Sequence, residues 1–498
     1  MRKGLYVLAD DATMHTQVVS EERRDALLIA ALGLAFFGVN VDFLMRGDAT
    51  TYATYVLLGK FDDLTLHIGY YAVVYALQHT VGRWFDVPIH ETMVYLNVVC
   101  GALTLSVSYL LARRLIGGRR DAFLVALMLA LCGRLFSNAT SSEIYMLQTL
   151  CVTSAMLWYV CDRPWLSGIA AGLGLLVSPL SCFAYLFFPT YELTRKEASR
   201  WGTFAAMVIA GSLVYLPYLV FFGHELFYGR RGLLKVSGFS PIDVGAFAAN
   251  FFKYQFKHYT ALLLLLIPGC FMIRGHRRLA LLSAMTVLPH IYIVLKLTME
   301  DNTFLLSTDF FVVLWMVLGM RWLLEQSKWR PVALVIPLVH VAILVFSRTI
   351  FHGESHRSYA TELRTIAKTY IIGKPAVLIS DWDVGMSLTH FARDSATAIV
   401  EDELLYRQMF DMTSHTLSDQ PSLEGVSIYV IDPWEPSPLS RLFSPAARLE
   451  SESYGNSVRR ISERRFGVRC TELSRQTHVL YQCERTRAAA GSPTQPGV

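Results

Sequence analysis

Charged residues are scarce in this chain of 498 residues: they make up 17% of it, against 53% hydrophobic residues and a mean hydropathy of +0.38. Soluble globular proteins carry about 25% charged residues, so this composition excludes an ordinary soluble protein and favours a membrane protein. The shortage is uneven, because residues 351–498 hold 16 basic and 18 acidic residues. The basic surplus therefore lies in residues 1–350, where short cytoplasmic loops would place it.

Other features are missing as well. The pI of about 8.7 comes without a clustered basic face, which argues against nucleic acid as a partner. None of the eight cysteines is spaced as Cys-x-x-Cys, so no metal site is expected, and six of them lie in or beside apolar runs. Only Cys470 and Cys483 lie in the polar C-terminal part, where they are a candidate disulfide pair if that part is outside the cytoplasm.

The N-terminus lacks a convincing signal peptide, because the apolar stretch LYVLA is short and acidic residues follow it. We expect residues 1–25 to be a cytoplasmic segment. The chain also has no visible internal repeat, a feature that many transporters show.

Residues 26–349 are expected to form an all-α membrane domain with about eleven transmembrane helices. Two of these spans come from 165–191, which Ser178-Pro179 breaks. With a cytoplasmic N-terminus, all five inner loops are rich in Lys or Arg, as the positive-inside rule requires. The other apolar runs lie near 26–45, 91–112, 122–137, 144–161, 202–222, 260–273, 279–298, 310–325 and 331–349.

The C-terminal part is expected to be a small soluble α/β domain at 350–485, outside the cytoplasm, followed by a disordered tail at 486–498. AVLIS, TAIV, VSIYVI and HVLYQC are typical of strands, and TELRTIAKTYI and DELLYRQMFDM of helices.

Three polar residues from separate outer stretches of the chain are expected at one face of the membrane. Asp48 and His67 lie in the outer loop 46–90, and Glu143 stands at the entrance to a later span in SNATSSEIY. Each alone could serve as a helix cap, an interfacial side chain or a first-turn acid. Ionisable groups at a membrane are functional candidates, and together these three favour a site.

The order GD, LHIGYY, VYLN and SSEIY resembles the C-type (GT-C) polytopic glycosyltransferases that use lipid-linked sugars. The resemblance covers residues 26–190 and is strongest to the branch of the DUF2723 and TMEM260-like protein O-mannosyltransferases. The residues that match its motifs are Asp48, His67, Gly69, Tyr70, Asn97, Glu143 and Tyr145.

The resemblance implies an integral membrane enzyme that transfers a sugar from a polyprenyl phosphate to an acceptor hydroxyl on the extracytoplasmic face. Asp48 would be the general base, with His67 and Glu143 as further catalytic residues and Tyr70, Asn97 and Tyr145 binding substrate. General-base catalysis is worth about 10²–10⁴-fold. The partners would be the lipid-linked donor, membrane lipid and a protein, glycan or lipid acceptor, most simply in a bacterial inner membrane.

The outer loop 223–259 is basic and aromatic. It offers cations to the donor phosphate, or it lies on anionic lipid. These residues are Arg230, Arg231, Lys235, Lys253, Lys257 and His258. Glu300 and Asp301 could hold a divalent cation beside Asp48, although no spacing requires one.

Two other functions stay open. One is a lipid or glycan transporter (a flippase). The other is an inactive family member that acts in glycan assembly, since Thr51 occupies a position where the family often has a second acid.

Overall fold

The computed structural model divides the chain into two compact units, Met1–Val41 with Val56–Phe351 and Asp42–Tyr55 with His352–Val498. The described residues are 3–42, 49, 52–53, 56, 67–85, 87–195, 200–228, 252, 255–297, 302–346, 362–371, 376–380, 398–401, 427–432, 463, 468–475 and 479–485. The expected helix at 402–412 and the tail at 486–498 lie outside them.

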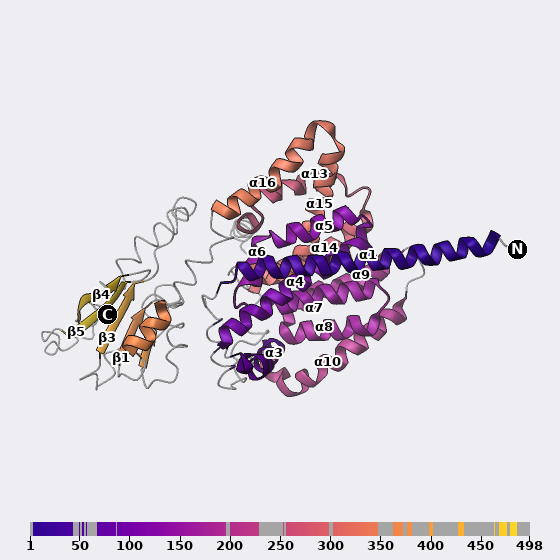
Figure 1. Cartoon of the computed structure of the whole chain (residues 1–498). Coiled ribbons are helices and arrows are strands. Elements are labelled where there is room, and N and C mark those ends of the chain that lie inside the picture. Colours follow the sequence, from indigo (N-terminus) through magenta and orange to yellow (C-terminus); the bar gives the residue numbers. More distant parts are fainter. Residues whose placement is uncertain are drawn as a thin grey trace. The chain divides into compact units, whose positions relative to one another are not determined.

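The first unit is built of helices (Figure 1). In chain order they are α1 (Lys3–Val39), α3 (Ile68–Leu77), α4 (Ile89–Ile116), α5 (Arg119–Ala130), α6 (Gly133–Thr140), α7 (Tyr145–Val160), α8 (Pro164–Val177), α9 (Phe187–Thr194), α10 (Trp201–Tyr228), α13 (Leu266–Phe271), α14 (Arg277–Leu297), α15 (Asp309–Glu325) and α16 (Arg330–Phe346). Short 3-10 segments precede α9, α13, α15 and α16 at Pro179–Leu186, Thr260–Leu265, Asn302–Thr308 and Ser327–Trp329. A π-helical turn, Gln78–Gly82, continues α3.

Helix α4 lies at the centre of this unit, in contact with α1, α5, α6 and α7. Helices α7, α8 and α10 lie side by side in that order (Figure 1). The apolar stretch of α4 is 67% buried and that of α10 only 17%, so α10 is peripheral. Its outer face exposes large apolar side chains such as Leu213, Val220 and Phe221, as a helix in contact with lipid would.

Small residues allow the closest helix contacts. A Cβ atom on Gly168 of α8 would lie 2.2 Å from the Met207 carbonyl oxygen of α10. A Cβ atom on Gly319 of α15 would lie 2.0 Å from the Leu265 carbonyl oxygen. Small residues at helix contacts are typical of membrane helices, which gain little from hydrophobic association and depend on close packing.

Within the described residues, four helical segments are long and apolar enough to cross a membrane: Ile89–Ile116, Trp201–His224, Leu305–Glu325 and Ser327–Phe346. The pair α5 and α6, bent by 63°, makes a fifth if it counts as one broken span. The expected eleven spans are therefore not confirmed. Several of them correspond to helices shorter than the roughly 20 residues that one crossing requires; α7 has 16 residues and α8 has 14.

Helix ends follow local sequence rules. Pro164 stands in the first turn of α8, where its missing N–H costs nothing. Helix α8 stops at Val177 because Pro179 drives the preceding Ser178 into an extended conformation (φ −158°, ψ 120°). Gly117 ends α4 with φ 79°, in the left-handed region that favours glycine.

The second unit contains a mixed five-stranded sheet of order β2-β1-β3-β5-β4. β1 pairs in parallel with β2 and β3, whereas β5 pairs antiparallel with β3 and β4. Cys470 and Cys483 face each other on β4 and β5 and are joined by a disulfide. The strands are β1 (Ala376–Ser380), β2 (Ala398–Glu401), β3 (Ser427–Asp432), β4 (Val468–Arg475) and β5 (Val479–Arg485).

Candidate functional site

Part of the predicted site lies outside the described residues: Asp48, Arg230, Arg231, Lys235 and Lys253. The structure does describe His67, Tyr70, Asn97, Glu143, Tyr145, Lys257 and His258.

His67 immediately precedes α3 and contacts the end of α8. Its Nδ1 lies 2.8 Å from the Val177 carbonyl oxygen, which the break at Ser178-Pro179 leaves without its ordinary helical partner. A carbonyl oxygen only accepts, so Nδ1 carries the proton and donates. Gly69 makes this contact possible, because a Cβ atom there would lie 2.9 Å from Leu176.

Asn97 connects α4 to the loop before α7. Its side-chain amide donates to the Ser141 carbonyl oxygen at 2.8 Å and also to that of Glu143. The Asn97 side chain is fully buried, and no described group pairs with its Oδ1. We call Ser141–Ile144, which contains Glu143, the Asn97 loop.

Gly101 lies one turn after Asn97 and brings α6 close to α4. A Cβ atom on Gly101 would lie 2.6 Å from the Cβ of Ala139 and 3.1 Å from the Phe37 ring. The sequence NVVCG thus places the hydrogen-bonding residue and the close packing contact on the same face of α4. Together they fix the end of α6 and the loop that follows it.

Aromatic side chains complete the cluster. The His67 ring lies edge-on to Tyr145, with centroids 6.0 Å apart, and Tyr70 packs edge-on against Tyr71 at 6.2 Å. Burial raises the pKa of Tyr70 well above its usual range; the nearby Cys100 and Glu143 raise this pKa further, and the nearby Asn97 lowers it.

Five predicted residues therefore meet at one place: His67, Tyr70, Asn97, Glu143 and Tyr145. His67 and Glu143 are only partly buried, whereas Tyr70 and Asn97 are completely buried. Two partly accessible titratable side chains are therefore found beside two fully buried neutral polar side chains. Such an arrangement can orient a hydroxyl-bearing ligand and move a proton.

Lys257 and His258 come shortly before the 3-10 segment Thr260–Leu265. The backbone of His258 packs against the start of α6, since a Cβ atom on Gly133 would lie 3.2 Å from its carbonyl oxygen. Lys257 is exposed. Their part in phosphate binding stays a prediction.

Sequence reasoning missed a buried charge network at the start of α6. Arg134 bonds to Asp309 and, through its second terminal nitrogen, to Gln255 at 3.3 Å. The Tyr259 hydroxyl donates to Asp309 at 2.5 Å, and Arg134 and Asp309 are each only 1% exposed. We call these four residues the Arg134 network. Its signal was in the sequence, because an arginine inside an expected span is a functional candidate in itself.

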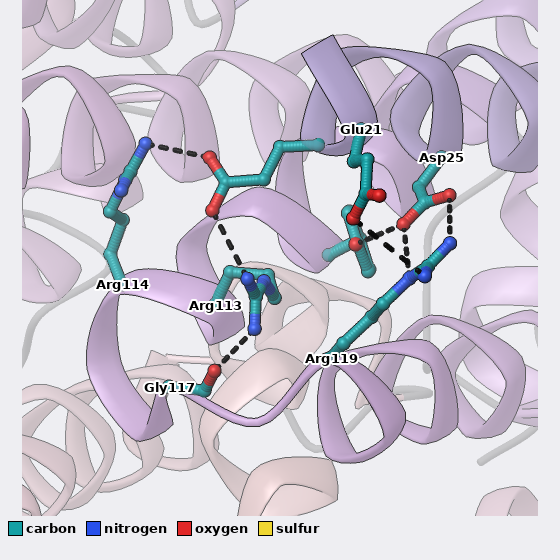
Figure 2. Close-up of polar contacts among 8 residues, drawn as sticks. Glu21, Asp25, Arg113, Arg114, Gly117 and Arg119 are labelled. Carbon is teal, nitrogen blue, oxygen red and sulfur yellow. Dashed lines mark hydrogen bonds and ion pairs between the residues drawn. The ribbon is translucent and has the colours of Figure 1, made fainter. Parts of the chain in front are cut away.

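A second charge cluster lies near the C-terminal end of α4, far from Asn97 (Figure 2). Arg113 and Arg114 bond to Glu22, at 3.4 and 2.8 Å, and Arg119 makes two bonds to Asp25, at 2.7 and 2.8 Å. Arg113 lies about 24 Å along α4 from Asn97, at about 1.5 Å per residue. The basic turn between α4 and α5 is therefore far from the five clustered residues.

No group of three or more His, Cys, Asp or Glu side chains among the described residues could hold a metal ion. Glu300 and Asp301 lie outside those residues.

No protein-family model matches the chain, and no curated protein matches it. Solved structures do. The chain is similar to ArnT from Cupriavidus metallidurans bound to undecaprenyl phosphate (TM-score 0.56, 12% identity, covering 96% of this chain and 100% of that one). It is also similar to the apo state of that protein (TM-score 0.54, 13% identity, covering 96% and 99%).

A third similar structure is the Archaeoglobus fulgidus oligosaccharyltransferase in complex with Zn and sulfate (TM-score 0.51, 14% identity, covering 76% of this chain and 62% of that one). Identities this low concern the fold alone. The likeness to ArnT extends over nearly the whole of both chains, and the apolar helices agree with it. The chain therefore shares the fold of ArnT.

Proposed function

We propose that this chain is an integral membrane glycosyltransferase that moves a sugar from a polyprenyl phosphate to an acceptor hydroxyl on the extracytoplasmic face. The observation that carries the proposal is the meeting of His67, Asn97, Glu143 and Tyr145, from separate segments, within a GT-C fold. The neighbour of this fold that binds undecaprenyl phosphate supports a lipid-phosphate donor.

In this proposal Asp48 takes the proton from the acceptor hydroxyl as its oxygen attacks the anomeric carbon of the sugar. The bond from that carbon to the phosphate oxygen breaks, and the polyprenyl phosphate leaves with the electron pair. His67 and Glu143 orient the reacting groups, and the basic residues of loop 223–259 stabilise the leaving phosphate. The second unit selects the acceptor, and the branch of protein O-mannosyltransferases remains the preferred subfamily.

The test is Asp48→Asn assayed with a radiolabelled lipid-linked sugar in detergent. We expect the variant to insert into the membrane and to unfold at the same temperature as the wild type, while its rate of sugar transfer falls by about 10²–10⁴-fold. Transfer at the wild-type rate would show that Asp48 is not the base. A wild-type protein that transfers no lipid-linked sugar to any acceptor would contradict the proposed function itself.

A transporter is the second candidate, favoured by one observation. Helices α5 and α6 form a bent pair of 63°, and Arg134 lies directly after the break. Broken helices with buried charges near mid-membrane are typical of transporters. Detergent solution allows no vectorial transport, so sugar transfer there distinguishes the two functions. The expected orientation, with a cytoplasmic N-terminus and an extracytoplasmic second unit, is testable by labelling residues 350–498 from either side of sealed vesicles.

A further inference from the structure

We propose that Arg134 and Asp309 are positioning residues for the candidate site: the buried pair fixes the start of α6, and α6 fixes the Asn97 loop that carries Glu143. This inference rests on the proposed function. It adds a role for two residues that the site itself does not contain.

The first part of the argument is the geometry of Arg134. Its two terminal nitrogens are used on different partners, Asp309 of α15 and Gln255 of the segment before Thr260–Leu265. Cys132 adds a weak bond to the other Asp309 oxygen at 3.7 Å. A guanidinium that bonds in two directions fixes its helix in orientation as well as in distance.

The segment that carries Gln255 and Tyr259 is itself held in place by its neighbours. Thr260 has φ 42°, a conformation that is strained for a β-branched residue. Its hydroxyl lies 2.6 Å from Nδ1 of His340, whose Nε2 bonds to the Leu131 carbonyl oxygen at 2.9 Å. Strain of this kind persists only where the surrounding structure fixes the backbone. Gln255 and Tyr259 therefore offer Arg134 a firm support.

Helix α6 is short enough to transmit this constraint. It has 8 residues, a length of about 12 Å, and Asn138 bonds back to the Arg134 carbonyl oxygen at 2.9 Å. Its far end is fixed by the contact of Ala139 with Gly101 and by the Asn97 amide. A short helix held at both ends has one orientation, and Glu143 follows directly from its last turn.

Stability alone is a weak explanation for the pair. Replacing a buried ion pair by neutral groups is often harmless, whereas removing one partner leaves an unpaired buried charge. The geometry instead favours orientation as the purpose, because a misplacement of about 1 Å at a reacting group can cost about 10²-fold in rate.

The experiment compares Arg134→Lys with the double variant Arg134→Gln/Asp309→Asn. Lysine keeps the charge beside Asp309 but cannot also bond to Gln255, and the double variant leaves no unpaired charge. For both we expect kcat to fall about 10–100-fold, with KM for the lipid-linked donor within about threefold of the wild type. Hydrogen exchange of residues 137–144 should accelerate about tenfold or more.

The matched control is Arg119→Lys, which weakens the two-bond pair with Asp25 at the other end of the α5–α6 pair. It should leave kcat and the exchange of residues 137–144 within about twofold of the wild type. Should Arg134→Lys fail to fold, the double variant and Tyr259→Phe, which removes only the hydroxyl bond to Asp309, carry the test.

Folded Arg134 variants with wild-type kcat and wild-type exchange would overturn the proposal, as would equal loosening of residues 137–144 in the Arg119 control. Exchange does not depend on activity. If the wild type transfers no sugar, the proposed function fails, while faster exchange in the Arg134 variants alone still supports the coupling of α6 to the Asn97 loop.

Discussion

Asn97 offers the sharpest test of the candidate site, because one side chain holds the loop that carries Glu143. Asn97→Ala removes the amide that donates to the carbonyl oxygens of Ser141 and Glu143. Asn97 is 0% exposed, so its side-chain amide is sheltered from bulk water. A hydrogen bond is worth about 0.5–1.5 kcal/mol and an unsatisfied buried group costs about 1–3 kcal/mol, so we expect a loss of about 2–4 kcal/mol.

The loss of stability should appear first in the Asn97 loop. If opening of the Asn97 loop becomes easier by about 2–4 kcal/mol, its open population rises about 30- to 1,000-fold, since 1.36 kcal/mol is a factor of ten. Hydrogen exchange of residues 141–145 measures this directly. Sugar transfer should fall about 10–100-fold at the same time, because Glu143 leaves its position.

Two further variants separate hydrogen bonding from cavity formation. Asn97→Asp keeps the size of the side chain but sets a carboxylate against two carbonyl oxygens, so it should be at least as harmful as Asn97→Ala. Ser106→Ala removes a comparable bond of the same helix, from its hydroxyl to the Ala26 carbonyl oxygen at 2.7 Å. It should cost about 1 kcal/mol and leave transfer per folded molecule unchanged. Wild-type transfer and exchange in both Asn97 variants would refute the reasoning.

Two other predictions concern Gly69 and Asp25. Gly69→Ala should destabilise the protein by about 1–3 kcal/mol in thermal unfolding and weaken the His67–Val177 contact, because the new Cβ would lie 2.9 Å from Leu176. The control is Gly38→Ala, where a Cβ would meet nothing within 4 Å. Equal unfolding temperatures for the two variants would contradict the prediction. The hydrogen bond from Arg119 lowers the pKa of Asp25, so its stabilisation is complete above the unfolded pKa of about 3.9 and is lost as the pH falls through the lower folded pKa. The wild type should therefore be more stable than Asp25→Asn at pH 7, and this advantage should shrink below about pH 4; a constant difference down to pH 3 would contradict it.

The sequence predicted those features that depend on local pattern. The break at Ser178-Pro179 appears as the end of α8, because proline restricts the residue before it. Four strands of the second unit coincide with the expected apolar runs. β4 was missed because its apolar residues alternate weakly and a register shift between Glu472 and Ser474 disturbs the pattern.

Features that depend on packing between distant segments could not be predicted in this way. The helix count is one example, because an apolar run does not tell whether its helix reaches the roughly 20 residues of one crossing, and α7 and α8 have only 16 and 14. The match of Asn97 to a family motif indicated importance, but its bonds to the Asn97 loop depend on the approach of α6 at Gly101. The partner of Arg134 was equally hidden, since Asp309 lies 175 residues away in the sequence.

Charge at the two ends of α5 obeys different physics. Arg119 is half-exposed although its partner Asp25 is buried, so the guanidinium stays in contact with water and its charge is screened by salt. Arg134 is 1% exposed and lies just after the break that follows α5, where a lone charge would be costly to insert. The charge of Arg134 is tolerated because Asp309 and Gln255 bond to it, and Tyr259 bonds to Asp309. A basic residue such as Arg119 is expected in any cytoplasmic loop. A buried arginine such as Arg134 requires a specific partner, and for this reason Arg134 points to function more strongly than Arg119 does.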